Sequence, residues 1–183
     1  WTFDRASENF AMDLNGGDVF KGRTAYALGD LPATNEMFVG YGEVDGIRLD
    51  DAWILDKSKA EWKTLAFGQD RPSPRRRLQM LSQPGTWTGT GDKLWMLFGN
   101  GLAASFNDVW RYDRAANSWT LVSTTGTVPD ARFDPCCTWI DTQVISCFGG
   151  TGGEGSYNDV HLFNTSNSVW SKVTTANTAP STR

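Results

Sequence analysis

The chain has 183 residues, a net charge of -4 and a pI of about 4.9, so it lacks the basic surface that gripping a nucleic-acid backbone requires. No apolar run is long enough to cross a bilayer and no secretory leader pattern stands at the start; because the first residue is Trp1, we expect a processed product or a fragment of a longer chain. Its 9 Trp and 19 Gly predict short packed strands joined by tight turns.

Residues 1–22 predict the last two strands of a repeated unit. Trp1 to Ala6 aligns with Trp110 to Ala115 in the middle of the chain, and Phe10 stands in a position that holds a Trp in later units. The chain therefore opens inside a repeat.

Three full copies of the unit follow, at residues 23–74, 75–131 and 132–182. Each begins with an Arg, continues through a glycine cluster and an acidic residue before an apolar run, and contains a Trp 13 residues before the next Arg. Several features kept in one register over three copies indicate a structural repeat. These repeat marks are Arg23, Arg75 and Arg132; Asp51, Asp108 and Asp159; Trp62, Trp119 and Trp170; and Gly40 to Gly42, Gly99 to Gly101 and Gly149 with Gly150.

The copy at residues 132–182 shows the strand pattern most clearly. Its apolar runs are Cys136 to Ile140, Val144 to Phe148, Val160 to Phe163 and Val169 to Val173, and Asp141-Thr142 predicts a hairpin loop between the first two. No long window has helical periodicity. We therefore predict an all-β fold in which each copy is a four-stranded antiparallel sheet stacked on its neighbours.

We favour a structural role in packing for the repeat marks over a catalytic role. Glycines after the second strand allow a sharp bend near a crowded centre. The Trp of the fourth strand can fill the wedge between adjacent sheets, and the Arg can donate to carbonyls or carboxylates across the contact between sheets.

These marks resemble the kelch repeat family. Phe148-Gly149-Gly150, Asn158-Asp159-Val160 and Trp170 match its pattern well, whereas Phe98-Gly99-Asn100 lacks the second Gly and the first copy is looser. The resemblance implies kelch-type β-propeller blades, with about three and a half present in this chain. Since such rings have about five to seven blades, further blades or a second copy of the chain would have to close the ring.

We find no catalytic or metal-binding set and predict no cofactor. The single histidine, His161, occupies the position of Trp53 and Trp110 in the other copies, so we expect a packed or surface strand residue. One His cannot form the paired-histidine sites of zinc or copper enzymes.

Two features favour a secreted setting slightly. With Asp141-Thr142 as the hairpin loop, Cys136 faces Cys147, which allows a cross-strand disulfide, although free buried cysteines are the alternative. Asn164-Thr165-Ser166 is a glycosylation sequon at a predicted turn.

The candidate binding residues lie in the variable loops that follow the glycine marks. These loops run from Glu43 to Arg48, Leu102 to Phe106 and Thr151 to Tyr157, and their length and chemistry differ while the strands keep register. Arg76 and Arg77 form a second candidate, because the position of Arg76 points into the channel in some kelch propellers that bind acidic peptides. We favour the alternative that both are solvated charges. The loop candidates are Glu43, Asp45, Arg48, Ser105, Glu154 and Tyr157.

Three functions fit these observations. The first is a binding or scaffolding propeller that mediates protein–protein interaction within a longer protein or assembly. The second is the scaffold of a secreted galactose-oxidase-like or other carbohydrate-active enzyme, with the active groups elsewhere. The third is an extracellular structural module glycosylated at Asn164.

Overall fold

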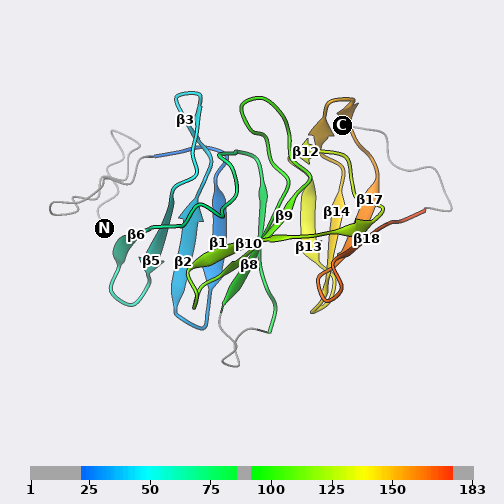
Figure 1. The fold of residues 1–183 in the computed structure, drawn as a ribbon. Coiled ribbons are helices and arrows are strands. Elements are labelled where there is room, and N and C mark those ends of the chain that lie inside the picture. The colour runs from blue at the N-terminus through cyan, green and yellow to red at the C-terminus, as the bar shows by residue number, and fades with distance from the viewer. Residues whose placement is uncertain (1–21, 86–91, 175–183) are drawn as a thin grey trace, which may run out of the picture.

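The computed structural model describes residues 22–85 and 92–174, and these residues form sheets arranged side by side in an open fan (Figure 1). The predicted all-β fold is confirmed, because every regular element of the described residues is a strand. The two strands expected in residues 1–22 lie outside the described part of the chain.

Three antiparallel units of four strands, which we call blades 1, 2 and 3, form most of the described fold, and the sheet of blade 3 has a fifth strand. Blade 1 has the order β1 (Ala27–Leu31), β2 (Glu36–Gly40), β5 (Ala52–Asp56) and β6 (Glu61–Leu65). Blade 2 has the order β7 (Gln79–Ser82), β8 (Lys93–Leu97), β9 (Val109–Asp113) and β10 (Ser118–Val122). Blade 3 has the order β13 (Cys136–Trp139), β14 (Val144–Phe148), β17 (Val160–Asn164) and β18 (Val169–Lys172).

Short strands complete the sheets. β11 (Thr125–Gly126), in the linker from blade 2, pairs in parallel with β18 and so covers the outer edge of blade 3. The loops between the second and third strands carry β3 (Glu43–Val44) with β4 (Ile47–Arg48), and β15 (Thr151–Gly152) with β16 (Gly155–Ser156). β12 (Arg132–Phe133) pairs with β15. These loops rise at the top of Figure 1, and we call that end the loop face.

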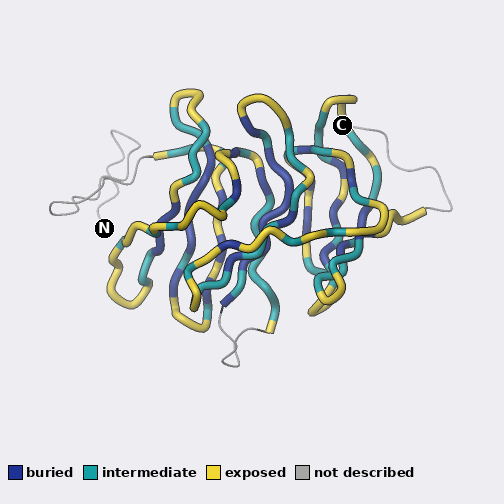
Figure 2. Tube along the Cα trace, in the orientation of Figure 1, coloured by how far each residue is buried: buried dark blue, intermediate teal, exposed yellow. Residues whose placement is uncertain are grey.

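A tryptophan fills each of the two wedges between blades. Trp119 of β10 packs edge-on against Phe38 of blade 1, with ring centroids 6.0 Å apart. Trp170 of β18 packs against Phe98 of blade 2 with the two rings tilted at 47° and their centroids 5.8 Å apart. Figure 2 shows the buried residues running along the strands and the exposed ones gathering in the loops. Trp62, the corresponding residue of blade 1, is half-buried.

The glycine marks sit where neighbouring blades are joined by backbone hydrogen bonds. Gly42 N–H donates to the Arg75 carbonyl at 2.8 Å, and Gly99 N–H donates to the Arg132 carbonyl at 3.0 Å. Gly42 has a φ of +87°, and a Cβ there would lie 2.7 Å from the Thr24 carbonyl oxygen. Both the backbone conformation and the close approach therefore require glycine.

The end opposite the loop face is held by polar contacts between blades 1 and 2. The buried Asp92 carboxylate accepts hydrogen bonds from Ala33 N–H and Thr34 N–H, both at 3.0 Å. Arg114 donates two hydrogen bonds to Glu36, at 2.6 and 2.9 Å. Burial alone would raise the pKa of Glu36, but the hydrogen bond and charge of Arg114 hold that pKa below its usual value. These contacts fix the two blades against each other.

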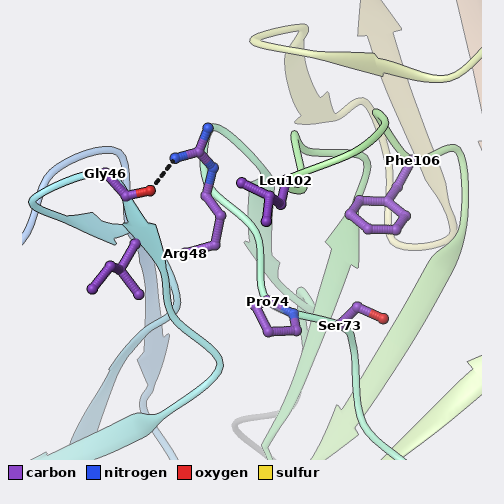
Figure 3. Close-up of a pocket in the computed structure, with 7 residues that line it drawn as sticks. Gly46, Arg48, Ser73, Pro74, Leu102 and Phe106 are labelled. Carbon is purple, nitrogen blue, oxygen red and sulfur yellow. Dashed lines mark hydrogen bonds between the residues drawn. The ribbon is translucent and has the colours of Figure 1, made fainter.

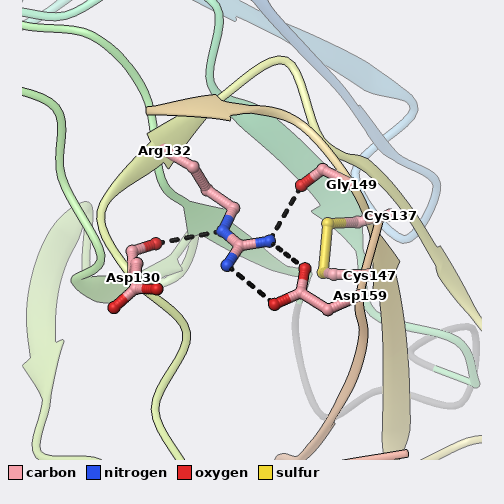
Figure 4. Close-up of a disulfide and its surroundings, with 6 residues drawn as sticks. All are labelled: Asp130, Arg132, Cys137, Cys147, Gly149 and Asp159. Atoms are coloured by element: carbon pink, nitrogen blue, oxygen red, sulfur yellow. Dashed lines mark hydrogen bonds and ion pairs between the residues drawn. A yellow bond between two sulfur atoms is a disulfide. The ribbon is translucent and has the colours of Figure 1, made fainter. Parts of the chain in front are cut away.

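The side chain of the repeated Arg is almost fully covered in every copy, but its partner differs from our expectation. Arg75 donates to the Asp108 carboxylate at 2.5 and 2.8 Å and to the Phe98 carbonyl at 3.1 Å. Arg132 binds Asp159 and the Gly149 carbonyl in the same way (Figure 4). The predicted bond across the blade contact is therefore wrong: the Arg before the first strand and the Asp before the third strand meet at the same end of one sheet.

The predicted Cys136–Cys147 disulfide is also wrong. The structure has a disulfide between Cys137 and Cys147 (Figure 4). Cys136 is exposed and unpaired. The loop contains three residues and not two, because Ile140 N–H donates to the Val144 carbonyl at 2.9 Å. The extra residue shifts the register by one position, so that Cys136 faces Phe148.

Candidate functional site

A pocket opens at the loop face between blades 1 and 2. It has a volume of about 460 Å³ and lies between the β3–β4 hairpin and the loop that follows β8 (Figure 3). Its walls are mainly apolar, with a single charged side chain. The lining residues are Gly46, Ile47, Arg48, Ser73, Pro74, Leu102 and Phe106.

The β3–β4 hairpin holds an exposed apolar side chain, Ile47, on one wall of this pocket. Val44 pairs with Ile47, and the two turn residues, Asp45 and Gly46, have φ values of 49° and 81°. Two positive φ angles define the tight turn that Asp-Gly favours. Ile47 is 66% exposed, and Leu102 on the opposite wall is 88% exposed. Two large apolar side chains held in solvent across a pocket are typical of a binding surface.

The aromatic wall of the pocket is fixed by a repeat mark. The guanidinium of Arg75 lies 3.8 Å from the ring centroid of Phe106, and Phe106 N–H donates to the Gly99 carbonyl. Since Arg75 is itself held by Asp108, the buried ion pair of blade 2 positions the pocket wall.

A polar network beside the pocket joins the two blades. The Glu43 carboxylate accepts a hydrogen bond from Arg48 and forms an ion pair with Arg76 at 3.0 Å. A second guanidinium nitrogen of Arg48 donates to the Asn100 side-chain oxygen at 3.3 Å. Asn100 in turn lies 3.5 Å from the Ser105 hydroxyl. The structure thus brings together four of the candidates named from sequence: Glu43, Arg48, Arg76 and Ser105.

The other candidates lie elsewhere. Arg77 pairs with Asp134 of blade 3 at 2.7 Å, and Glu154 stands exposed in the turn between β15 and β16. Tyr157 packs on the guanidinium of Arg132 at 4.1 Å, as Phe106 packs on Arg75, which gives it a structural role. Asp45 occupies the exposed tip of the β3–β4 hairpin and does not line the pocket.

Sequence reasoning placed Ile47, Leu102 and Phe106 in variable loops but did not single them out, and it missed Pro74. The signal that could have found them is the presence of large apolar residues in loops whose other members are polar or small.

His161 and Asn164 both have structural partners. His161 is buried, with one ring nitrogen 3.0 Å from Asp159 and the other 3.2 Å from the Thr127 carbonyl. It takes the position of Trp110, whose indole donates to Asp108 at 2.7 Å. Asn164 accepts from Ser166 N–H at 2.9 Å, which is the turn-stabilising role that Asp56 and Asp113 have in the other blades.

The described residues contain no group of three or more His, Cys, Asp or Glu side chains arranged to hold a metal ion. Nor does this part of the chain include a helix with the length and apolar character needed to span a membrane.

Comparison with known proteins agrees with this geometry. Residues 85–183, more than half of the chain, match the family model described as the KLHDC2/KLHL20/DRC7 Kelch-repeats domain. The chain belongs to the kelch-repeat family. Its blades are therefore those of a kelch propeller, although the described residues do not close a ring.

Two similar proteins are much longer than this kelch segment. The flagellar outer-arm dynein alpha chain of Chlamydomonas reinhardtii is 29% identical over 75% of the chain, and the match covers 3% of the dynein. The Rab9 effector protein with kelch motifs of Mus musculus is 28% identical over 68% of the chain, a match covering 33% of the effector. The segment thus spans a third or less of these relatives. Neither comparison supports the carbohydrate-active enzyme or the glycosylated module expected as alternatives.

Proposed function

We propose that this kelch segment is a protein-interaction scaffold that binds its partner at the loop face between blades 1 and 2. The observation that carries the proposal is the pocket whose two walls present Ile47 and Leu102 largely exposed. Burying such side chains against a partner removes apolar surface from water, which drives association. A Rab9 effector among the relatives supports a binding role for kelch repeats of this kind.

We further infer that residues 23–74, 75–131 and 132–182 each form one blade and that the segment works within a larger ring. The three sheets fall within these ranges. Further blades of a longer protein, or a second copy of the chain, would close the ring. The greater length of the relatives favours the longer protein.

Affinity purification with a matched pair of variants tests the binding proposal. The chain, the double variant Ile47→Ser with Leu102→Ser, and the control Leu121→Ser are each used as bait, and the captured proteins are quantified by mass spectrometry. Leu121 is a suitable control because it is 55% exposed on the outer strand β10, away from the pocket.

We expect the double variant to lose specific partners that the control retains, while both keep the unfolding temperature of the unmodified chain. Capture that is the same for the double variant and the unmodified chain would contradict the proposal.

A further inference from the structure

The charges around the pocket are already paired with one another. Arg48, the one charged residue in the lining, donates to Glu43, to the Gly46 carbonyl and to Asn100. Arg76 pairs with the same glutamate. Glu43 and Arg48 are only 16% and 13% exposed as side chains, so an incoming charge has little access to either.

The remaining arginines of the loop face are paired as well. Arg77 lies 2.7 Å from Asp134 and Arg71 lies 2.8 Å from Asp50. Arg77 and the exposed Asp45 lie outside the pocket lining, and Arg48 and Arg76 share the one carboxylate of Glu43. Each of these arginines therefore already has a carboxylate partner, and Arg48, which lines the pocket, is largely covered.

The interior of the pocket is apolar and roomy. Its aliphatic walls are Ile47, Pro74 and Leu102, and its aromatic wall is the ring of Phe106. The Arg75 guanidinium packs on this ring. The volume of about 460 Å³ is enough for a large side chain.

We propose that the pocket takes a large uncharged apolar side chain, Leu, Met or Phe, presented by a loop of a partner protein. This inference rests on the proposed function and names the chemistry that the partner brings to the site. An apolar pocket whose one charged lining residue, Arg48, is paired and only 13% exposed complements an uncharged anchor, because a charged group would lose its water with little access to a counter-charge. Apolar anchors buried in a pocket are the residues that dominate affinity in protein interfaces.

Fluorescence anisotropy with four synthetic peptides tests this proposal on the full 183-residue chain. The peptides share Gly-Ser flanks and carry Phe, Leu, Ser or Glu at the central position, and each is titrated at about 50 mM and at about 500 mM salt. We expect the Phe and Leu peptides to bind at least about tenfold more tightly than the Ser and Glu peptides. Their affinity should change little with salt, since exposed ion pairs do not contribute.

The variants assign the preference to the pocket. Ile47→Ser with Leu102→Ser should abolish the preference for Phe and Leu, whereas Leu121→Ser and Arg77→Gln should keep it. Tightest binding by the Glu peptide, a steep loss of affinity with salt, a preference that survives in the double variant, or no binding up to about 1 mM would each overturn the proposal.

These failures differ from a failure of the proposed function. If the peptides show no apolar preference but partner capture still depends on Ile47 and Leu102, the inferred anchor is wrong while the binding site stands. If capture is also insensitive to these residues, the binding site itself is wrong.

Discussion

At the scale of single residues, each blade depends on an arginine that is charged and almost fully enclosed. Arg75 is 1% exposed and Arg132 is 2% exposed. Enclosing a guanidinium is tolerable only when its donors and its charge are both satisfied. In both blades one Asp and backbone carbonyls satisfy them, which explains why these residue types recur at fixed spacing.

Removing the carboxylate should therefore be costly. We expect Asp108→Ala to lower the free energy of unfolding by about 3 kcal/mol, because it leaves Arg75 buried without a counter-charge. Asp134→Ala is the matched control: it breaks the exposed pair with Arg77 and should cost less than about 1 kcal/mol. Urea denaturation measures both values, and equal losses in the two variants would contradict the distinction.

The equivalent pair of blade 3 predicts a pH dependence. Burial alone would raise the pKa of Asp159, but hydrogen bonds and charge from Arg132 and His161 lower it to about 2. The ionised form is thus favoured by folding, so its contribution to stability is complete well above pH 3.8, the usual value, and is lost as the pH falls through about 2.

We expect the difference in free energy of unfolding between the unmodified chain and Asp159→Asn to shrink as the pH is lowered from about 6 to about 2. Denaturant titrations across this range measure it. A difference that stays constant with pH would show that Asp159 is not held in its ionised form by folding.

At the scale of elements, the β13–β14 hairpin shows why strands are easier to predict than their register. The apolar runs predicted from sequence agree with β13, β14, β17 and β18 to within one residue at each end. The predicted partner of Cys147 was wrong, because a difference of one residue in the length of the loop shifts the register of the two strands. Asp141 accepts from both Gln143 N–H and Val144 N–H, which stabilises the longer loop.

Thiol counting tests the observed register. Under oxidising conditions and after denaturation, the unmodified chain should show one free thiol and Cys136→Ser none, since Cys137 and Cys147 remain joined. Cys137→Ser should show two free thiols, those of Cys136 and Cys147. Two free thiols in Cys136→Ser and none in Cys137→Ser would establish the Cys136–Cys147 pair and contradict the structure.

At the scale of the whole molecule, the stacking of blades 1 and 2 creates a pocket that no single repeat contains. The sequence predicted the blades because the Arg, Gly, Asp and Trp marks each answer a local packing need that recurs in every copy. It could not predict the pocket, since Ile47 and Leu102 lie in loops of different blades and meet only when the sheets stack. Nor could it predict that Arg48 and Arg76 would share Glu43.

Site-specific photo-cross-linking tests the central claim that the loop face between blades 1 and 2 binds a protein partner. A photoreactive phenylalanine analogue replaces either Leu102, on the pocket wall, or Leu121, which is exposed on β10. After illumination in cells, we predict discrete cross-linked proteins from position 102 and none of these from position 121. Cross-links that form equally from both positions, or only from position 121, would contradict the claim.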